Sequence, residues 1–335
     1  MNQNEFLQDE GAGVPRVVVA GVGGCGCRAV QVMAERGIAD AHFACADADF
    51  QELRRSPAET HLPLGEKLAG GLGAGGDPRI GREAAMESIQ SIGEAFKDAE
   101  LAIVVCGLGG GAGTGAAPVV ARAAREAGAL VAVLAVMPFE FEGAERAGIA
   151  RSGLAELARE ADCVFPMPND RLLASASSGT PLKEFMRKAL DGLFFCAKDI
   201  SSLETAPRHI CLDPADVRTC MAGTGLGAVG MGRGSGRMRA RDAVQQALAD
   251  ILQNGVVLGS AKSVTYVMTA PEDLSGEEME EIGEIIREPL SSGTNIVYSL
   301  VFDSALEDGG EIRVTVIASG VEQTEQAVHE ASRSR

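Results

Sequence analysis

The chain has 335 residues, of which 46% are hydrophobic and only 4% aromatic, and its formal net charge at pH 7 is −17. This length allows two domains with separate cores, and the absence of Trp means that those cores consist mainly of aliphatic side chains. The acidic balance excludes binding of nucleic acid or of an anionic membrane surface through a basic patch.

Neither a metal centre nor a membrane span is expected. Cys25 and Cys27 are separated by one residue, and no second Cys/His pair stands at the spacing of a zinc site. The other cysteines are scattered through the chain, which is typical of reduced thiols in a cytoplasmic protein. No segment reaches the roughly 18 uninterrupted apolar residues of a membrane span. Residues 1–14 lack an apolar signal core, so we expect a disordered extension there.

Apolar runs that resemble strands alternate with helical patterns in the first half of the chain. Their near-continuous hydrophobicity predicts a parallel sheet covered by helices on both faces, and therefore a doubly wound α/β domain over residues 15–180. In such a fold, a ligand lies at the carboxyl ends of the strands. The expected strands are Arg16–Ala20, His42–Ala46, Leu101–Cys106, Leu130–Val136 and Cys163–Met167.

A long helical pattern follows and leads into a second domain. Apolar residues recur at helical spacing within residues 181–207, which predicts one long central helix. Residues 208–320 are expected to form a smaller α/β domain with a mixed sheet, and residues 321–335 a short polar tail. The glycine-rich run Gly223–Gly236 is assigned no strand. The expected elements of this domain are the helices Arg241–Gln253 and Gly276–Glu288 and the strands Ser263–Thr269, Asn295–Phe302 and Ile312–Ala318.

A glycine-rich segment directly after the third expected strand is the strongest functional signal. It runs from Gly109 to Gly115 and precedes a helical pattern from Ala116 to Ala127. Glycines let several backbone N–H groups turn toward one point, and the next helix N-terminus adds a partial positive charge, so the segment predicts a phosphate cradle. A flexible surface turn is the alternative, but flexible linkers are rarely held between a buried strand and a helix. The candidate phosphate-binding residues are Gly107, Gly109, Gly110, Gly111, Ala112, Gly113, Thr114 and Gly115.

The first expected strand also ends in glycines. Gly21–Gly26 satisfies G-x-G-x-x-G and precedes a helix that is expected to begin at about Arg28. The next strand ends in Asp47 and Asp49, so a dinucleotide-binding oxidoreductase is a competing hypothesis. A further glycine loop at Gly70–Pro78 favours a chain of phosphates surrounded by backbone donors. The candidate nucleotide-binding residues in these two loops are Gly21, Gly23, Gly24, Cys25, Arg28, Ala74 and Gly75.

These motifs resemble the tubulin/FtsZ superfamily of self-assembling GTPases, and more closely its FtsZ branch. The cradle is similar to the signature G-G-G-T-G-[TS]-G, and Gly70–Pro78 is similar to the glycine loop near the terminal phosphate. Pro138–Arg146 resembles the ribose segment P-F-x-F-E-G-x-x-R, and Pro168–Arg171 resembles the turn P-N-D-[RK]. Leu212–Thr219 resembles the catalytic loop N-x-D-x-A-D-V-[RK]-T. The resemblance covers nearly the whole folded chain.

The resemblance implies a head-to-tail filament in which one subunit holds GTP or GDP, with Mg²⁺, and the next subunit completes the active site. It implies that Asp213 and Asp216 are catalytic, since a carboxylate pair can orient an attacking water and bind a nearby cation. A heterologous contact of this kind does not close and therefore propagates a filament. The alternative role of these two residues is capping of the helix that Pro214 begins, which is favourable by about 1 kcal/mol.

The resemblance also implies nucleotide contacts from the segments after the later strands. Glu142 and Arg146, which follow Pro138, are expected at the ribose and phosphate, and Asn169 at the base or ribose. For Glu142 and Arg146 the alternative is an i,i+4 surface ion pair worth about 0.3–0.5 kcal/mol. Asn169 could instead cap a turn.

Departures from the family pattern are concentrated where the base is expected. Arg28 stands where Asn is usual, Met186 where a Phe covers the guanine, and Leu190 where an Asp reads the guanine edge. A guanine that faces Leu190 would lose a charge-assisted hydrogen bond of roughly 1.5–3 kcal/mol, so we expect weaker affinity or weaker selectivity for GTP over ATP. Ala112 and Cys211 replace a Thr of the cradle and an Asn of the catalytic loop, which is expected to affect hydrolysis more than binding.

Two functions are consistent with these patterns. The leading hypothesis is a filament-forming GTPase of the cytoskeletal, cell-division type. The alternative is an FtsZ-like structural or regulatory scaffold that hydrolyses little nucleotide and is linked to membrane remodelling through adaptors. Residues 321–335 are too few for a long linker with a terminal adaptor-binding peptide, so we expect no such peptide, and the sequence identifies no adaptor.

Overall fold

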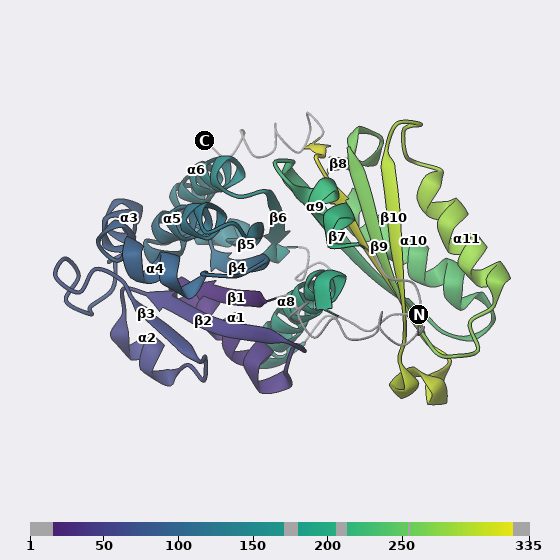
Figure 1. Ribbon diagram of the computed structural model, residues 1–335, viewed down its shortest axis with the longest axis horizontal. Helices are drawn as coiled ribbons and strands as arrows, with labels where there is room; N and C mark the ends of the chain where they lie inside the picture. Colours follow the sequence, from purple (N-terminus) through teal and green to yellow (C-terminus); the bar gives the residue numbers. More distant parts are fainter. Residues whose placement is uncertain (1–15, 171–179, 206–212, 254, 324–335) are drawn as a thin grey trace, which may run out of the picture.

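The computed structural model describes residues 16–170, 180–205, 213–253 and 255–323 (Figure 1). The elements up to β6 are β1 (Val17–Val22), α1 (Gly23–Arg36), β2 (Ala41–Asp47), α2 (Phe50–Arg55), β3 (Thr60–Pro63), α3 (Pro78–Glu87), α4 (Ile89–Ala95), β4 (Leu101–Gly107), α5 (Ala112–Glu126), β5 (Leu130–Met137), α6 (Ala144–Glu160) and β6 (Cys163–Pro168). The elements after β6 are α8 (Leu182–Thr205), α9 (Pro214–Met221), β7 (Gly225–Gly234), α10 (Arg239–Leu252), β8 (Val256–Val257), β9 (Ser263–Ala270), α11 (Gly276–Arg287), β10 (Asn295–Phe302), β11 (Ile312–Ser319) and β12 (Glu322–Gln323).

The principal strands belong to one ten-stranded sheet of order β10-β9-β11-β7-β6-β5-β4-β1-β2-β3. β1 to β6 are parallel, which confirms the predicted doubly wound, mostly parallel domain. In the second domain, β9 and β10 are parallel and β11 is antiparallel to β9 and β7, so this part of the sheet is mixed. The two parts join where β6 pairs with β7 over two residue pairs, Cys163 with Gly225 and Val164 with Leu226.

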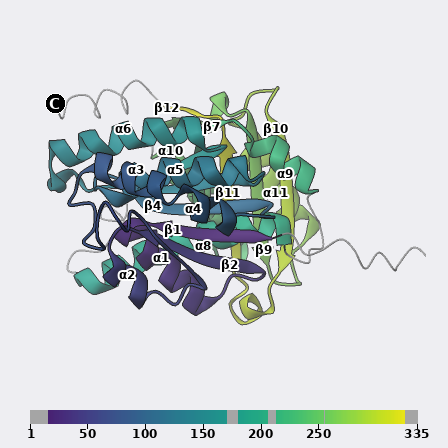
Figure 2. The same ribbon diagram turned by 60° about the vertical axis from the view of Figure 1, so that its left-hand side comes forward.

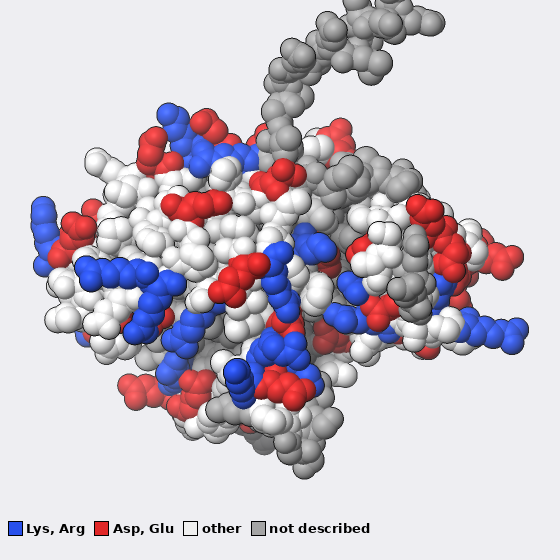
Figure 3. Space-filling model, turned by 90° about the horizontal axis from the view of Figure 1, so that it is seen from below, with Lys and Arg blue, Asp and Glu red and all other residues white. Residues whose placement is uncertain are grey.

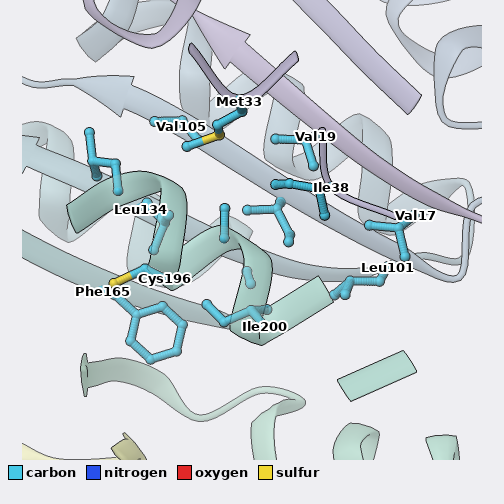
Figure 4. Packing of buried hydrophobic residues seen from close by; sticks show 14 of the residues in the cluster. Val17, Val19, Met33, Ile38, Leu101, Val105, Leu134, Phe165, Cys196 and Ile200 are labelled. Carbon is cyan, nitrogen blue, oxygen red and sulfur yellow. The ribbon is translucent and has the colours of Figure 1, made fainter. Parts of the chain in front are cut away.

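Helices cover both faces of the parallel strands. Successive strand residues point to opposite faces, so Val17 and Val19 pack with α1 and α8, whereas Val18 and Ala20 pack with α3, α4, α5 and α6. Figure 4 shows the first of these cores, in which Ile200 of α8 faces the strands. In Figure 2, α5 and α6 lie above the strands and α1 and α2 lie below them.

Helix α8 lies between the two domains and contacts them differently. Toward the parallel strands its contacts are mainly apolar, with Ile200 fully buried in the first core. Toward the second domain, the Phe195 ring lies 5.0 Å from the guanidinium of Arg233, and Asp199 accepts a 2.5 Å hydrogen bond from Thr315. Beside these contacts, a cavity of about 810 Å³ lies between α8 and the strands β7, β9, β10 and β11. A third core, on the far face of these strands, lies under α10 and α11.

The glycine-rich run that we assigned no strand contains β7, which corrects the expectation. Cβ atoms added at Gly230, Gly232 and Gly234 would lie 1.9 to 2.0 Å from carbonyl oxygens of α10. These alternate residues share one face of the strand, so α10 packs directly on the strand backbone. Glycine is a packing residue here, and its low β propensity concealed the strand.

Two helices of the first domain begin earlier than the sequence predicts. α1 begins at Gly23 and not at about Arg28, and α5 begins at Ala112 and not at Ala116. The glycines of both motifs therefore belong partly to the first helical turn. Helix propensity disfavours glycine by about 1 kcal/mol per residue, which explains why the pattern suggested longer loops.

One face of the molecule is seen from below in Figure 3. On that face, Lys and Arg side chains are intermingled with Asp and Glu (Figure 3). Within the described ranges, no helix is both long enough and apolar enough to cross a membrane.

Candidate functional site

The site begins where the N-termini of α1 and α5 meet at the carboxyl ends of β1 and β4. Val22 and Gly111 precede these helices, and neither helix start receives a side-chain cap. A Cβ atom added at Gly23 would lie only 2.6 Å from the backbone nitrogen of Gly113, so the two helix starts are in direct contact. Both helix N-termini therefore add partial positive charge at the same place.

Several glycines of the two motifs are required by protein packing. A Cβ at Gly21 would lie 2.4 Å from the carbonyl oxygen of Gly26, and one at Gly113 would lie 2.2 Å from that of Gly107. A Cβ at Gly107 would collide with that of Cys25, at 2.6 Å. Side chains at these positions would force the strands and helix starts apart, so these glycines hold the framework of the cradle.

Other glycines of the cradle leave room for a ligand. Nothing lies within 4 Å of a Cβ built at Gly110, which is half-buried between β4 and α5. The first intrahelical bond of α5 joins the N–H of Gly115 to the carbonyl of Gly111, so the N–H groups of residues 112–114 precede the hydrogen-bonded turns. An open space beside such donors is suited to an anion.

The loop before α3 is the second open part of the site. Gly75 has φ +58°, and a Cβ there would meet nothing within 4 Å. Ala74 is buried, and its Cβ would lie 2.8 Å from one added at Gly111, so its methyl group packs on the cradle. Asp77 caps α3 by accepting from the N–H of Arg79. The structure therefore brings this loop to the cradle.

We did not foresee how closely α3 packs on α5. A Cβ at Gly81 would lie 2.4 Å from the carbonyl oxygen of Gly111, and one at Gly115 would lie 1.9 Å from that of Pro78. These contacts fix the loop of Gly75 relative to the cradle. A glycine inside the helical pattern that follows Asp77-Pro78 is the signal that could have revealed this approach.

Thr114 and Arg146 shape the wall of the cradle. The buried Thr114 hydroxyl accepts a 2.9 Å hydrogen bond from the N–H of Gly109. Gly109 has φ +96°, and a Cβ there would lie 2.6 Å from Cγ of Arg146. The hydrogen bond of Thr114 therefore stabilises the turn at Gly109, and the aliphatic part of the Arg146 side chain packs directly against Gly109.

The segment after β5 contains the expected pair of Glu142 and Arg146. The Glu142 carboxylate lies 2.9 Å from Nε of Arg146 and also accepts from the N–H of Phe139, which follows Pro138. The i,i+4 ion pair that we considered as the alternative is therefore present. Asn169 is half-buried directly after β6, and the neighbouring Asp170 accepts from the N–H of Glu140. Arg171 lies outside the described residues.

Residues of α8 lie beside this segment. Phe185 is buried, and its ring centre is 5.8 Å from that of Phe139, so this side chain occupies a core position. Met186, one residue later, is 45% exposed. Leu190 packs partly buried against the first core, and Asp191 lies 2.6 Å from the guanidinium of Arg36.

Charged groups surround the first glycine loop. A Cβ at Gly24 would lie 3.3 Å from Nη2 of Arg28 and 3.9 Å from Oδ2 of Asp47. Arg28 also lies 3.7 Å from Glu52. Burial raises the pKa of Asp47, although the N–H of Asp49 donates a 3.1 Å hydrogen bond to its carboxylate. Cys25, in the same turn, is exposed.

The two predicted catalytic acids, Asp213 and Asp216, lie near the amino ends of the parallel strands, whereas the cradle lies at the carboxyl ends. Asp213 caps α9 by accepting a 2.9 Å hydrogen bond from the N–H of Ala215, and Asp216 is exposed in the first turn. Arg218 of α9 bonds the carbonyl of Gly128, just before the start of β5. Strands of seven or eight residues, at about 3.3 Å per residue, separate this edge from the cradle by roughly 20 Å. Cys211 lies outside the described residues.

The described part of the chain contains no group of three or more His, Cys, Asp or Glu side chains that could hold a metal ion. The site therefore consists of backbone donors, open glycine positions and a few charged side chains around two helix N-termini. This composition is suited to a phosphate chain.

The chain matches two protein-family descriptions. Residues 16–177 match the GTPase domain of the Tubulin/FtsZ family, and residues 225–322 match the C-terminal domain of the FtsZ family. The cell division protein FtsZ of Caulobacter vibrioides is 39% identical over 308 residues, which are 92% of this chain and 60% of the relative. FtsZ of Pseudomonas aeruginosa is 37% identical over 315 residues, which are 94% of this chain and 79% of the relative.

Solved structures show the same architecture. An FtsZ dimer from M. jannaschii aligns with a TM-score of 0.86 and 34% identity, covering 94% of this chain and 90% of that one. CetZ2 from Haloferax volcanii, in a GTPγS-bound protofilament, has a TM-score of 0.77 over 95% of this chain and 98% of that one, and at 22% identity it supports the fold alone. The chain spans 60% of the length of its Caulobacter relative. The matched segments, the sheet topology and the glycine cradle together establish that this chain belongs to the FtsZ family within the tubulin/FtsZ superfamily.

Proposed function

We propose that this chain binds GTP and GDP between α1, α5 and the loop before α3, assembles head to tail, and hydrolyses GTP at the contact between subunits. Its function would be cytoskeletal and of the cell-division type. Two relatives named cell division protein FtsZ, at 39% and 37% identity, support this class of function.

The main support for nucleotide binding is the contact between the N-termini of α1 and α5, neither of which has a side-chain cap. The approach at Gly23 and Gly113 is so close that side chains are excluded, while the space beside Gly110 is open. Bound phosphates would accept from the backbone N–H groups there and benefit from both helix dipoles. Mg²⁺ supplies charge neutralisation at phosphate oxygens when it is bound with the nucleotide, and it requires few protein ligands.

Hydrolysis in this proposal needs two subunits. Asp213 and Asp216 lie near the amino ends of the parallel strands, and the cradle lies at the carboxyl ends. A single chain therefore cannot bring these acids to the nucleotide that it binds. In a head-to-tail contact, the surface of one subunit that contains the start of α9 would face the cradle of the next subunit. There the exposed Asp216 carboxylate is available to orient a water molecule toward the terminal phosphate.

We also propose that this chain binds the guanine base more weakly than a chain with the usual residues of the family at these positions. Leu190 offers no hydrogen-bond acceptor to a guanine edge, and the exposed Met186 replaces an aromatic cover. Loss of one charge-assisted hydrogen bond corresponds to roughly 1.5–3 kcal/mol, or at least a tenfold loss of selectivity for GTP over ATP.

A scaffold that binds nucleotide but hydrolyses little is the second candidate function. Asp213 favours it, because one of its carboxylate oxygens is already used to cap α9. In that case assembly would depend on the bound nucleotide, and phosphate release would not accompany it.

Phosphate release and light scattering, measured together with GTP and with ATP, test the proposal. We expect GTP-dependent assembly with phosphate release, and loss of at least tenfold in release for Asp216→Ala with unchanged nucleotide binding. Asp242→Ala is the matched control, because Asp242 is also exposed in the first turn of a helix, α10. Assembly without phosphate release, unaffected by Asp216→Ala, would establish the scaffold instead. Absence of any bound nucleotide at millimolar GTP would overturn both functions.

A further inference from the structure

Asp162, between α6 and β6, connects the start of the parallel strands to the end of α9. The residue is 9% exposed. One carboxylate oxygen accepts a 2.9 Å hydrogen bond from the N–H of Val131 in β5, and the other accepts a 3.2 Å bond from the N–H of Gly223, which follows α9. A buried carboxylate that uses both oxygens on backbone donors of two different segments fixes their relative position.

The backbone of Asp162 reinforces the same connection. Its carbonyl accepts from the N–H of Gly225, at 3.0 Å, and lies 3.3 Å from the hydroxyl of Thr224, which is also 2.9 Å from the carbonyl of Met221 at the end of α9. Its own N–H donates to the carbonyl of Val131. β6 and β7 pair over only two residue pairs directly beyond this point, so these side-chain and backbone bonds add substantially to the connection.

The position of α9 matters because its far end carries the acids of the proposed reaction. α9 has eight residues, so it is about 12 Å long, and a tilt of about 10° at its fixed end would move its start by about 2 Å. Misplacement of a catalytic group by about 1 Å can reduce a rate by about a hundredfold. A bond at the end of α9 can therefore control chemistry at its start.

We propose that Asp162 is a positioning residue, which sets the direction in which α9 presents Asp213 and Asp216 to the nucleotide held by the next subunit. This inference rests on the proposed function. Asp162 is not a catalytic residue, because it lies buried beneath the subunit contact. It acts through α9 on a neighbouring molecule, while the cradle of its own subunit lies at the other edge of the sheet.

Asp162→Asn tests the inference with almost no change of volume. The amide nitrogen cannot accept from an N–H group, so one of the two carboxylate hydrogen bonds is lost. We expect phosphate release to fall at least tenfold, while affinity for a fluorescent GTP analogue stays within twofold. Asp250→Asn is the matched control, since Asp250 accepts from the N–H of Met231 in the second domain, away from α9. It should leave phosphate release unchanged.

A mixing experiment separates positioning from general damage. Gly110→Glu should place a carboxylate in the open part of the cradle and abolish nucleotide binding, but it leaves α9 intact. When the two variants are mixed, the Gly110→Glu subunit provides a correctly positioned α9 and the Asp162→Asn subunit provides an intact cradle. Phosphate release should therefore rise at least threefold above the sum of the rates of the two separate proteins. A merely destabilised Asp162→Asn would not be rescued.

Each outcome decides the inference. A normal rate for Asp162→Asn, a parallel loss of nucleotide affinity, or no rescue on mixing would overturn it. If Asp162→Asn does not fold, as judged by urea unfolding, Thr224→Val provides the second test. It removes the hydroxyl that joins the Asp162 carbonyl to the carbonyl of Met221, the last residue of α9, and should reduce phosphate release twofold to fivefold. An unchanged rate would then refute the inference. Wild-type protein that binds GTP but releases no phosphate would refute the proposed function first, and the inference with it.

Discussion

The two glycine-rich segments of the site, 109–115 and 70–76, have similar compositions but use glycine for different physical reasons. In 109–115, Cβ atoms at Gly113 and Gly115 would lie 2.2 and 1.9 Å from backbone carbonyl oxygens. In 70–76, Gly70, Gly75 and Gly76 have nothing within 4 Å of a built Cβ, but their φ angles are +57°, +58° and +81°.

Glycine is therefore required for close backbone packing in the first segment and for its backbone conformation in the second. A packing glycine cannot be replaced unless two backbone segments move apart, because carbonyl groups of regular structure cannot rotate away. A loop glycine with positive φ can be replaced at the cost of local strain, of about 1–2 kcal/mol per residue. Gly110 belongs to neither class, since its φ is not positive and the space around it is open.

The largest expected effect is that of Gly113→Ala. Its methyl group would overlap the carbonyl oxygen of Gly107, so we expect loss of at least about 3 kcal/mol in the free energy of unfolding, measured in urea. Gly93→Ala is the matched control, because Gly93 lies within α4 and a Cβ there meets nothing within 4 Å. It should stabilise the protein by about 0.5–1 kcal/mol. Equal stabilities of the two variants would contradict the assignment of Gly113 as a packing residue.

Gly110→Ala is expected to affect binding and not folding. Its methyl group would enter the open space in which we place a phosphate, so the affinity for GTP should fall at least tenfold, or about 1.4 kcal/mol, in a titration with a fluorescent analogue. The free energy of unfolding without nucleotide should stay within about 0.5 kcal/mol of wild type. Unchanged affinity would show that the phosphates lie elsewhere.

The smallest effect is expected for Gly75→Ala. Strain at φ +58° should reduce the free energy of unfolding by about 1 kcal/mol. Asn tolerates the left-handed conformation better than Ala, so Gly75→Asn should recover most of that loss. The comparison of loops would be wrong if Gly75→Ala destabilised the protein as strongly as Gly113→Ala does.

Much of the fold could be predicted because its strands are nearly continuous apolar runs. β10 has the bounds that we expected, Asn295–Phe302, and α8 begins one residue later and ends two residues earlier than the helix expected over residues 181–207. β7 was missed because its glycines lower its β propensity, and only the backbone of α10 explains them. Local patterns contain no information about which backbone will pack against a given glycine.

The site was predicted unevenly for the same reason. The cradle and the loop at Gly75 could be found, because clustered glycines after a strand have a local cause. Asp162 could not be found, because its partners, Val131 and Gly223, are 31 and 61 residues away. The predicted nucleotide contacts of Glu142, Arg146 and Asn169 stay predictions, and the structure adds an ion pair and a capping bond at Glu142.

The sequence by itself determined the α/β class, the parallel strands, the two glycine motifs and the family, since each depends on residue type and short spacing. Only the tertiary structure decided which glycines pack and which leave space, that the helix starts of α1 and α5 touch, and that Asp213 and Asp216 lie at the opposite edge from the cradle. These are distances between segments far apart in the chain. They depend on how the helices pack on the sheet, which no local pattern of residues specifies.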